Sequence, residues 1–122
     1  MTKAALFALT LSVLGSACGD DGDSGSGLDR SGVVTALPPA DLMTLCEWST
    51  ETQGGAGTTT ECGDHTVTVE DAPHCADGFT GKTCTLTVGQ LEDCVNVLAD
   101  DPCGALQSSS CGPVIECAFA GP

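Results

Sequence analysis

Basic residues are nearly absent from this 122-residue chain, which has three Lys and Arg against seventeen Asp and Glu. If the first seventeen residues are removed, only Arg30 and Lys82 remain to oppose the acids, and the net charge is about −15. Nucleic acids and anionic lipid surfaces are bound through clustered Lys and Arg, so both repel such a chain. The charge therefore excludes nucleic acid as a partner. It predicts a solvated acidic surface and leaves open weak capture of divalent or cationic partners.

Aromatic residues and catalytic motifs are scarce as well. Trp48 is the only tryptophan in a chain with 3% aromatic residues, and we expect it to pack rather than to bind a ligand. No G-x-S-x-G, H-E-x-x-H, P-loop or G-x-G-x-x-G pattern occurs. Glu92 and Asp93 are adjacent on a predicted helix and point in different directions, unlike a glycosidase pair. We expect no catalytic residues, no cofactor, no metal and no enzyme activity.

The chain also lacks an apolar run long enough to span a bilayer, which takes about 20 residues. Its longest run, Ala4 to Leu14, follows Lys3 and has the length and order of the apolar region of a signal peptide. Gly15-Ser16-Ala17-Cys18 comes next. This stretch resembles the lipobox of bacterial lipoproteins, where the peptide is cut before a cysteine that becomes lipid-modified. Gly15 stands where that pattern usually has leucine.

The lipobox resemblance implies that residues 1–17 are a signal peptide and that lipid on Cys18 anchors the protein to a membrane of the cell envelope. Because Gly19 rather than an aspartate follows the cysteine, the resemblance favours the outer membrane. The alternative is an ordinary secretory signal cut near Ala17. In that case the protein is secreted and Cys18 is a free thiol.

The nine cysteines agree with a lipidated Cys18, because an odd number in an exported protein leaves one unpaired. The other eight can form four disulfides, a density typical of an exported scaffold stapled in an oxidising compartment. Of the 105 connectivities, we predict only one pair, Cys46–Cys94, because both cysteines lie beside the apolar stripes of the two main helices. The eight expected disulfide cysteines are Cys46, Cys62, Cys75, Cys84, Cys94, Cys103, Cys111 and Cys117.

The clearest predicted helix spans about 88–99, and the rest of the chain is expected to be arranged around it. Thr87 can cap this helix, and Gln90 can complete a capping box. Cys84 and Cys103 bracket the helix, and Cys94 lies near its middle. Apolar residues at spacings of three and four form one stripe, made of Val88, Leu91, Val95 and Leu98.

A second helix is predicted from about 39 to 52, because Pro39 suits a first helical turn and Gly54-Gly55 ends the pattern. A β-hairpin should follow over about 58–69, turning at Gly63-Asp64 and placing Cys62 opposite His65. Residues 70–83 are predicted to be mostly loop with one helical turn near Pro73. Short helical turns complete the C-terminus. The fold class is small disulfide-rich α+β, with Leu42, Leu45, Cys46 and Ser49 on one face of the second helix.

Residues 19–36 are rich in Gly, Ser and Asp and show no apolar period. This composition is typical of a flexible, solvated linker. We therefore predict three parts: the signal peptide 1–17, a lipid-anchored acidic tether 18–36, and a disulfide-stapled domain 37–122.

The pattern C-T-x-T-V-G-x-x-E-x-C runs from Cys84 to Cys94. Leu45-Cys46 precedes it, and the D-P-C of residues 101–103 and two late cysteines follow it. Over residues 45–117 this arrangement resembles small cysteine-rich lipoproteins of myxobacterial type. The resemblance implies a tethered, stapled domain at the cell envelope and carries no activity.

These features predict a non-catalytic envelope protein that presents a rigid binding domain to a protein or another envelope partner. A secreted effector such as a protease inhibitor is the alternative, with 76–83 as its constrained loop and Lys82 as the basic anchor. A third class, a metalloenzyme, would need a zinc site. The candidate ligands for that site are Cys62, His65, His74 and Cys75, two of which disulfides would consume.

Overall fold

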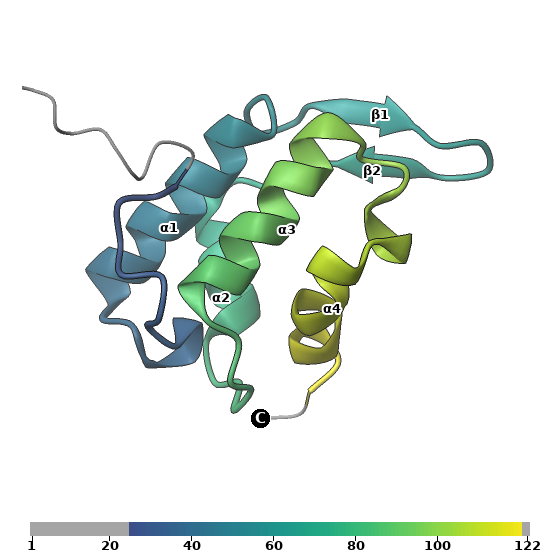
Figure 1. Ribbon diagram of the computed structural model, residues 1–122. Helices are drawn as coiled ribbons and strands as arrows, with labels where there is room; N and C mark the ends of the chain where they lie inside the picture. Colours follow the sequence, from purple (N-terminus) through teal and green to yellow (C-terminus); the bar gives the residue numbers. More distant parts are fainter. Residues whose placement is uncertain (1–24, 121–122) are drawn as a thin grey trace, which may run out of the picture.

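The computed structural model describes residues 25–120 (Figure 1). It contains helices, a two-stranded antiparallel hairpin and four disulfides, which confirms the predicted small disulfide-rich α+β class. In chain order the elements are η2 (Val34–Ala36), α1 (Pro39–Thr52), β1 (Thr59–Glu61), β2 (Thr66–Thr68), α2 (Ala72–Phe79), α3 (Val88–Asp100), η3 (Ala105–Gln107), η4 (Ser109–Cys111) and α4 (Gly112–Ala118).

Helix α3 lies between α1 and α4, and α2 packs against α1 (Figure 1). The predicted capping box starts α3. The Thr87 hydroxyl accepts a hydrogen bond from the Gln90 N–H at 3.2 Å, and the Gln90 side chain accepts one from the Thr87 N–H at 3.0 Å. Val88, Leu91 and Val95 of the predicted stripe are buried. The helix expected to organise the chain is therefore its central element.

Helix α1 has the predicted bounds, and its predicted buried face is confirmed. It starts at Pro39 and ends at Thr52. Gly54 and Gly55, with φ of 107° and 102°, follow the helix in the left-handed region that glycine adopts most readily. The buried residues of α1 are Leu42, Leu45, Cys46 and Ser49, and Trp48 packs partly buried against the core.

The hairpin has the predicted register. Thr60 lies opposite Val67, and the Cys62 N–H donates to the His65 carbonyl at 2.7 Å to close the turn. Gly63 has a φ of 80°, as the first position of a tight two-residue loop requires. Each strand has three residues, and the hydrogen bonds from the Cys62 N–H to the His65 carbonyl and from the Val69 N–H to the Thr58 carbonyl extend the pairing over the predicted 58–69.

The loop predicted over 70–83 is wrong, because residues 72–79 form the eight-residue helix α2. The Asp71 carboxylate caps this helix by accepting the His74 N–H at 3.0 Å, and Pro73 occupies the first turn. Aspartate at the cap and proline in the first turn are normal start signals for a helix. The helix continues beyond the predicted turn because Cys75 and Phe79 pack against the main core.

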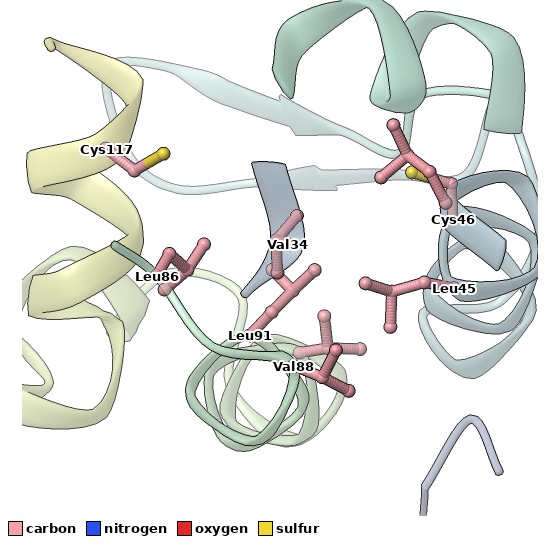
Figure 2. Close-up of a cluster of buried hydrophobic side chains, with 9 residues drawn as sticks. Val34, Leu45, Cys46, Leu86, Val88, Leu91 and Cys117 are labelled. Carbon is pink, nitrogen blue, oxygen red and sulfur yellow. The ribbon is translucent and has the colours of Figure 1, made fainter. Parts of the chain in front are cut away.

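The main core lies between α1, α3, α4 and the segment that precedes α1. Figure 2 shows Val34 in the middle of this cluster, with Leu86 to one side and Leu45 to the other. Val34 is fully buried. A residue expected in a flexible tether is therefore at the centre of the core.

The predicted tether is accordingly wrong for residues 25–36. The Val34 N–H donates to the Leu86 carbonyl and the Val88 N–H to the Gly32 carbonyl, both at 2.8 Å. Residue 33 also forms an isolated antiparallel bridge with Thr87. The segment pairs with residues 86–88, far along the chain, so no local apolar period predicts its place in the fold. The folded domain thus begins before the predicted boundary at 37, and residues 18–24 of the tether lie outside the described part.

Candidate binding groove

All eight predicted disulfide cysteines are paired. Three of the disulfides each use one cysteine that lies on α3 or beside it. These cysteines are Cys84, Cys94 and Cys103. The predicted Cys46–Cys94 pair is wrong. The observed pairs are Cys46–Cys75, Cys62–Cys103, Cys84–Cys117 and Cys94–Cys111.

The pairing error has two structural causes. Cys94 precedes Val95 and is therefore turned about 100° around α3 from it. Val95 packs in the main core, whereas Cys94 joins a second buried cluster with Ala105 and Cys111. Cys46 meets instead Cys75 of α2, the helix that the sequence indicated only as a single turn.

Sequence reasoning also missed a buried carboxylate that holds the N-terminal segment. Glu92 is 1% exposed and accepts hydrogen bonds from the Ser26 N–H at 2.8 Å and the Ser26 hydroxyl at 2.7 Å. Its second oxygen lies 2.9 Å from Nη1 of Arg30. A buried charge is tolerated when it is paired and hydrogen-bonded, and Glu92 meets both conditions. The available signal was Arg30 itself, an isolated cation in an acidic, glycine-rich stretch.

Arg30 is further held on the surface of α3. Its Nη2 lies 3.1 Å from the Asp93 carboxylate, and this hydrogen bond and charge raise the pKa of Arg30. A Cβ at Gly89 would lie 3.0 Å from the same nitrogen, so glycine lets the guanidinium lie close against the helix. The Glu92-Asp93 pair, read from the sequence as unsuited to catalysis, thus serves as an anchor for Arg30.

The loop proposed for a protease inhibitor does not present its basic residue. Residues 76–79 belong to α2. The Lys82 ammonium donates to the carbonyls of Ala118 and Ala120 at 2.9 and 3.0 Å. Ala118 is the last residue of α4 and Ala120 follows just beyond it, where terminal helical carbonyls lack internal partners and a cation is favoured. Lys82 therefore holds the C-terminal helix in place.

The histidines are not brought together with thiolates. Cys62 and Cys75, two of the candidate zinc ligands, are in disulfides with Cys103 and Cys46. Within residues 25–120, no group of three or more His, Cys, Asp or Glu is arranged to hold a metal ion. In the same part of the chain, no helix is long and apolar enough to cross a membrane.

His74 and Asp71 form an exposed pair at the start of α2. The His74 Nδ1 lies 2.7 Å from the Asp71 carboxylate, and this hydrogen bond raises the pKa of His74. The hydrogen bond from the His74 N–H lowers the pKa of Asp71. The pair caps a helix, which explains both shifts without a catalytic role.

A groove of 380 Å³ lies between the helices and the hairpin. A volume of this size falls within the range of about 300–1,000 Å³ found for ligand pockets. Most of its wall is apolar. The lining residues are Ser49, Thr50 and Gln53 of and beside α1, Val67 to Glu70 of and after β2, Cys75, Gly78 and Phe79 of α2, Leu91, Cys94, Val95 and Leu98 of α3, and Val114 and Ala118 of α4.

The polar groups of this groove are already engaged or lack reactive chemistry. The Ser49 hydroxyl accepts a hydrogen bond from the Gln53 amide at 3.0 Å, and the Thr50 hydroxyl donates to the Glu70 carbonyl at 2.9 Å. The lining contains no histidine, and its cysteines are in disulfides. Glu70 is its one charged residue. Such a wall suits an apolar ligand.

Cys18 and the signal peptide lie outside residues 25–120, so their predicted roles stay predictions. In comparisons with known proteins, no family, curated protein or solved structure matches this chain.

Proposed function

We propose that this chain is a non-catalytic binding module of the cell envelope, anchored by lipid on Cys18, which engages a protein or another envelope component through the groove. The observation that carries the proposal is the way the groove is built. Every element that forms its wall carries or adjoins a disulfide cysteine: Cys46 in α1, Cys62 at the hairpin, Cys75 in α2, Cys94 in α3 and Cys117 in α4.

Such a wall favours binding because it is ordered before a partner arrives. Association costs free energy for each side chain and loop that must become ordered, and a preorganised surface avoids much of this cost. Four disulfides are therefore useful to a binding surface as well as to stability.

The anchor is supported by the order of the N-terminal signals and by the cysteine count. Eight cysteines pair with one another, which leaves Cys18 as the ninth. Two or three acyl chains hold a protein firmly, at about 0.8 kcal/mol for each buried methylene. This is enough to keep an acidic domain at a membrane that repels it. Gly19 after the cysteine favours the outer membrane.

The anchor is tested by Cys18→Ser in the native host. The wild-type protein should partition into detergent and carry a mass increment for lipid, and the variant should lose both properties. A wild-type protein recovered in the aqueous phase with an unmodified Cys18 would contradict the anchor and favour the secreted alternative.

The binding role is tested by capture from envelope extracts with the exported, oxidised protein as bait. Val67→Asp places a charge in the groove wall and should abolish capture of the specific partner. Thr44→Asp, on an exposed part of α1 that does not line the groove, is the matched control and should leave capture intact. If both variants capture the same proteins as the wild type, the groove is not the binding surface.

A further inference from the structure

The outer edge of β2 carries backbone groups that the hairpin does not use. Directly opposed residues of an antiparallel pair alternate between hydrogen-bonded and non-hydrogen-bonded positions. The Val69 N–H donates to the Thr58 carbonyl at 2.9 Å, so the next opposed pair, Thr59 and Thr68, is non-hydrogen-bonded. The N–H and C=O of Thr68 therefore point away from β1. Within residues 25–120 neither group has a backbone partner.

The groove runs along this same edge. Consecutive residues of a strand send their side chains to opposite faces. Val67 and Thr68, the last two residues of β2, nevertheless both line the groove, as do Val69 and Glu70 beyond the strand. A hollow shared by two consecutive strand residues reaches the edge of the strand rather than one of its faces alone. A chain lying there would meet the peptide group of Thr68 and the apolar lining residues Leu98 and Val114.

The size of the groove favours an extended occupant. Neighbouring strands lie about 4.8 Å apart, whereas a helix with its side chains is about 10–12 Å wide. A strand is narrower than a helix, and the groove of 380 Å³ accommodates a strand with a few side chains directed into the wall.

Charge further narrows the choice of occupant. The chain carries a net charge of −14, and Glu70 is the one charged residue of the groove lining. Both basic residues of the described chain are occupied elsewhere, Arg30 by α3 carboxylates and Lys82 by α4 carbonyls. A second copy of this chain would be repelled, whereas a segment flanked by Lys or Arg would be attracted.

We infer that β2 receives, as a third strand, an extended segment of a partner protein with alternating apolar side chains and basic flanks. The inference deepens the proposed binding function and rests on it. Main-chain hydrogen bonds to Thr68 would contribute affinity and register, and the apolar wall would select the side chains, as in other cases of strand addition.

The test uses the exported, oxidised protein and a blocked synthetic peptide of sequence Lys-Val-Thr-Val-Thr-Lys, with binding followed by calorimetry. Thr68→Pro removes the outward N–H of β2 and no hydrogen bond of the hairpin. Thr59→Pro, directly opposite, makes the same change on the outer edge of β1, which does not line the groove. We expect binding about tenfold weaker or worse for Thr68→Pro and changed by less than about twofold for Thr59→Pro.

A measurement on the unmodified protein makes the test independent of how the variants fold. The same peptide with its central amides N-methylated cannot extend the sheet, so we expect it not to bind. A peptide with Glu in place of both Lys residues should bind more weakly.

Equal loss in the two proline variants, or full binding of the N-methylated peptide, would overturn the inference. The second result would point to an apolar ligand that fills the groove without strand pairing, and the proposed binding function would stand. If the wild-type protein binds neither the unmodified Lys peptide nor its N-methylated form, the inference is also overturned. The Cys18 and envelope-capture experiments would still decide the proposed function separately.

Discussion

Two segments flank α3 and are attached to it by different means. Residues 25–36 contain no cysteine and are held by Glu92, by backbone hydrogen bonds and by the burial of Val34. Residues 103–118 contain three cysteines, and all three are in disulfides. The comparison shows that one helix can hold one segment noncovalently and another through disulfides. The cysteine count predicted only the attachment through disulfides.

Reduction of the disulfides should have the largest effect on stability, because it removes the covalent attachment altogether. The four disulfides join residues separated by 17 to 41 positions in the chain. Each should contribute about 2–4 kcal/mol, mainly by restricting the unfolded chain. We expect the reduced and alkylated protein to unfold, and the N-terminal segment to detach with it because α3 no longer has a fixed position. A reduced protein that kept native dispersion in its NMR spectrum would contradict this prediction.

Glu92→Gln should have an intermediate effect, confined to the noncovalent attachment. The variant keeps the shape of the side chain, but its amide group must face either the donors of Ser26 or the guanidinium of Arg30. Leaving buried donors without acceptors costs about 1–3 kcal/mol. We expect a loss of stability of that size in chemical denaturation, together with faster amide exchange at Val34.

Asp93→Asn is the matched control for this prediction. It removes the charge of the second carboxylate that contacts Arg30, but the Asp93 side chain is 54% exposed. Exposed ion pairs contribute about 0–1 kcal/mol, so this variant should change stability little and leave exchange at Val34 unaltered. If it destabilised the protein as much as Glu92→Gln, the attachment would depend on Arg30 alone rather than on the buried carboxylate.

The smallest expected effect on stability comes from the Asp71–His74 pair. This pair caps α2 and contacts neither residues 25–36 nor residues 103–118. His74 has a raised pKa, so its contribution is complete below about pH 6.5 and is lost as the pH rises through its folded pKa. Asp71 has a lowered pKa, so its contribution is present above its ordinary pKa of 3.8 and is lost as the pH falls. Stability from this pair should therefore be greatest between these limits, with a modest size because both groups are exposed.

Asp71→Asn tests this pH dependence, because asparagine still caps the helix but carries no charge. An NMR titration should return the pKa of His74 towards its ordinary value, with little change in stability at neutral pH. A His74 pKa that stays raised in the variant would assign the shift to the neighbouring acids Glu70 and Asp77 instead.

Features that depend on neighbours in the sequence were predictable. The capping box at Thr87, the bounds of α1 and the register of the hairpin turn each depend on residues two to four positions apart. Both helix stripes were also readable, because burial of one helix face repeats every three to four residues. These signals are local, so the fold class followed from them.

Features that depend on distant contacts were missed. Ser26 and Glu92 are 66 positions apart, and Arg30 and Glu92 are 62 apart, so nothing near either residue indicates the partner. The prediction of a partner for Cys46 was wrong for the same reason. Its partner depends on where α2 packs, and the start signals at Asp71 and Pro73 did not reveal how far the helix runs. The groove was unpredictable as well, because its wall is assembled from residues between 49 and 118.

The sequence by itself determined the charge, the eight cysteines available for four disulfides, and the two main helices with their buried faces. The tertiary structure decided which cysteines meet, that residues 25–36 belong to the domain, and that an open strand edge borders an apolar groove. The physical reason is the range of the interactions. Helix capping and amphipathic burial act within a few residues, whereas disulfides, the Glu92 contacts and the groove exist only after distant segments pack against α3.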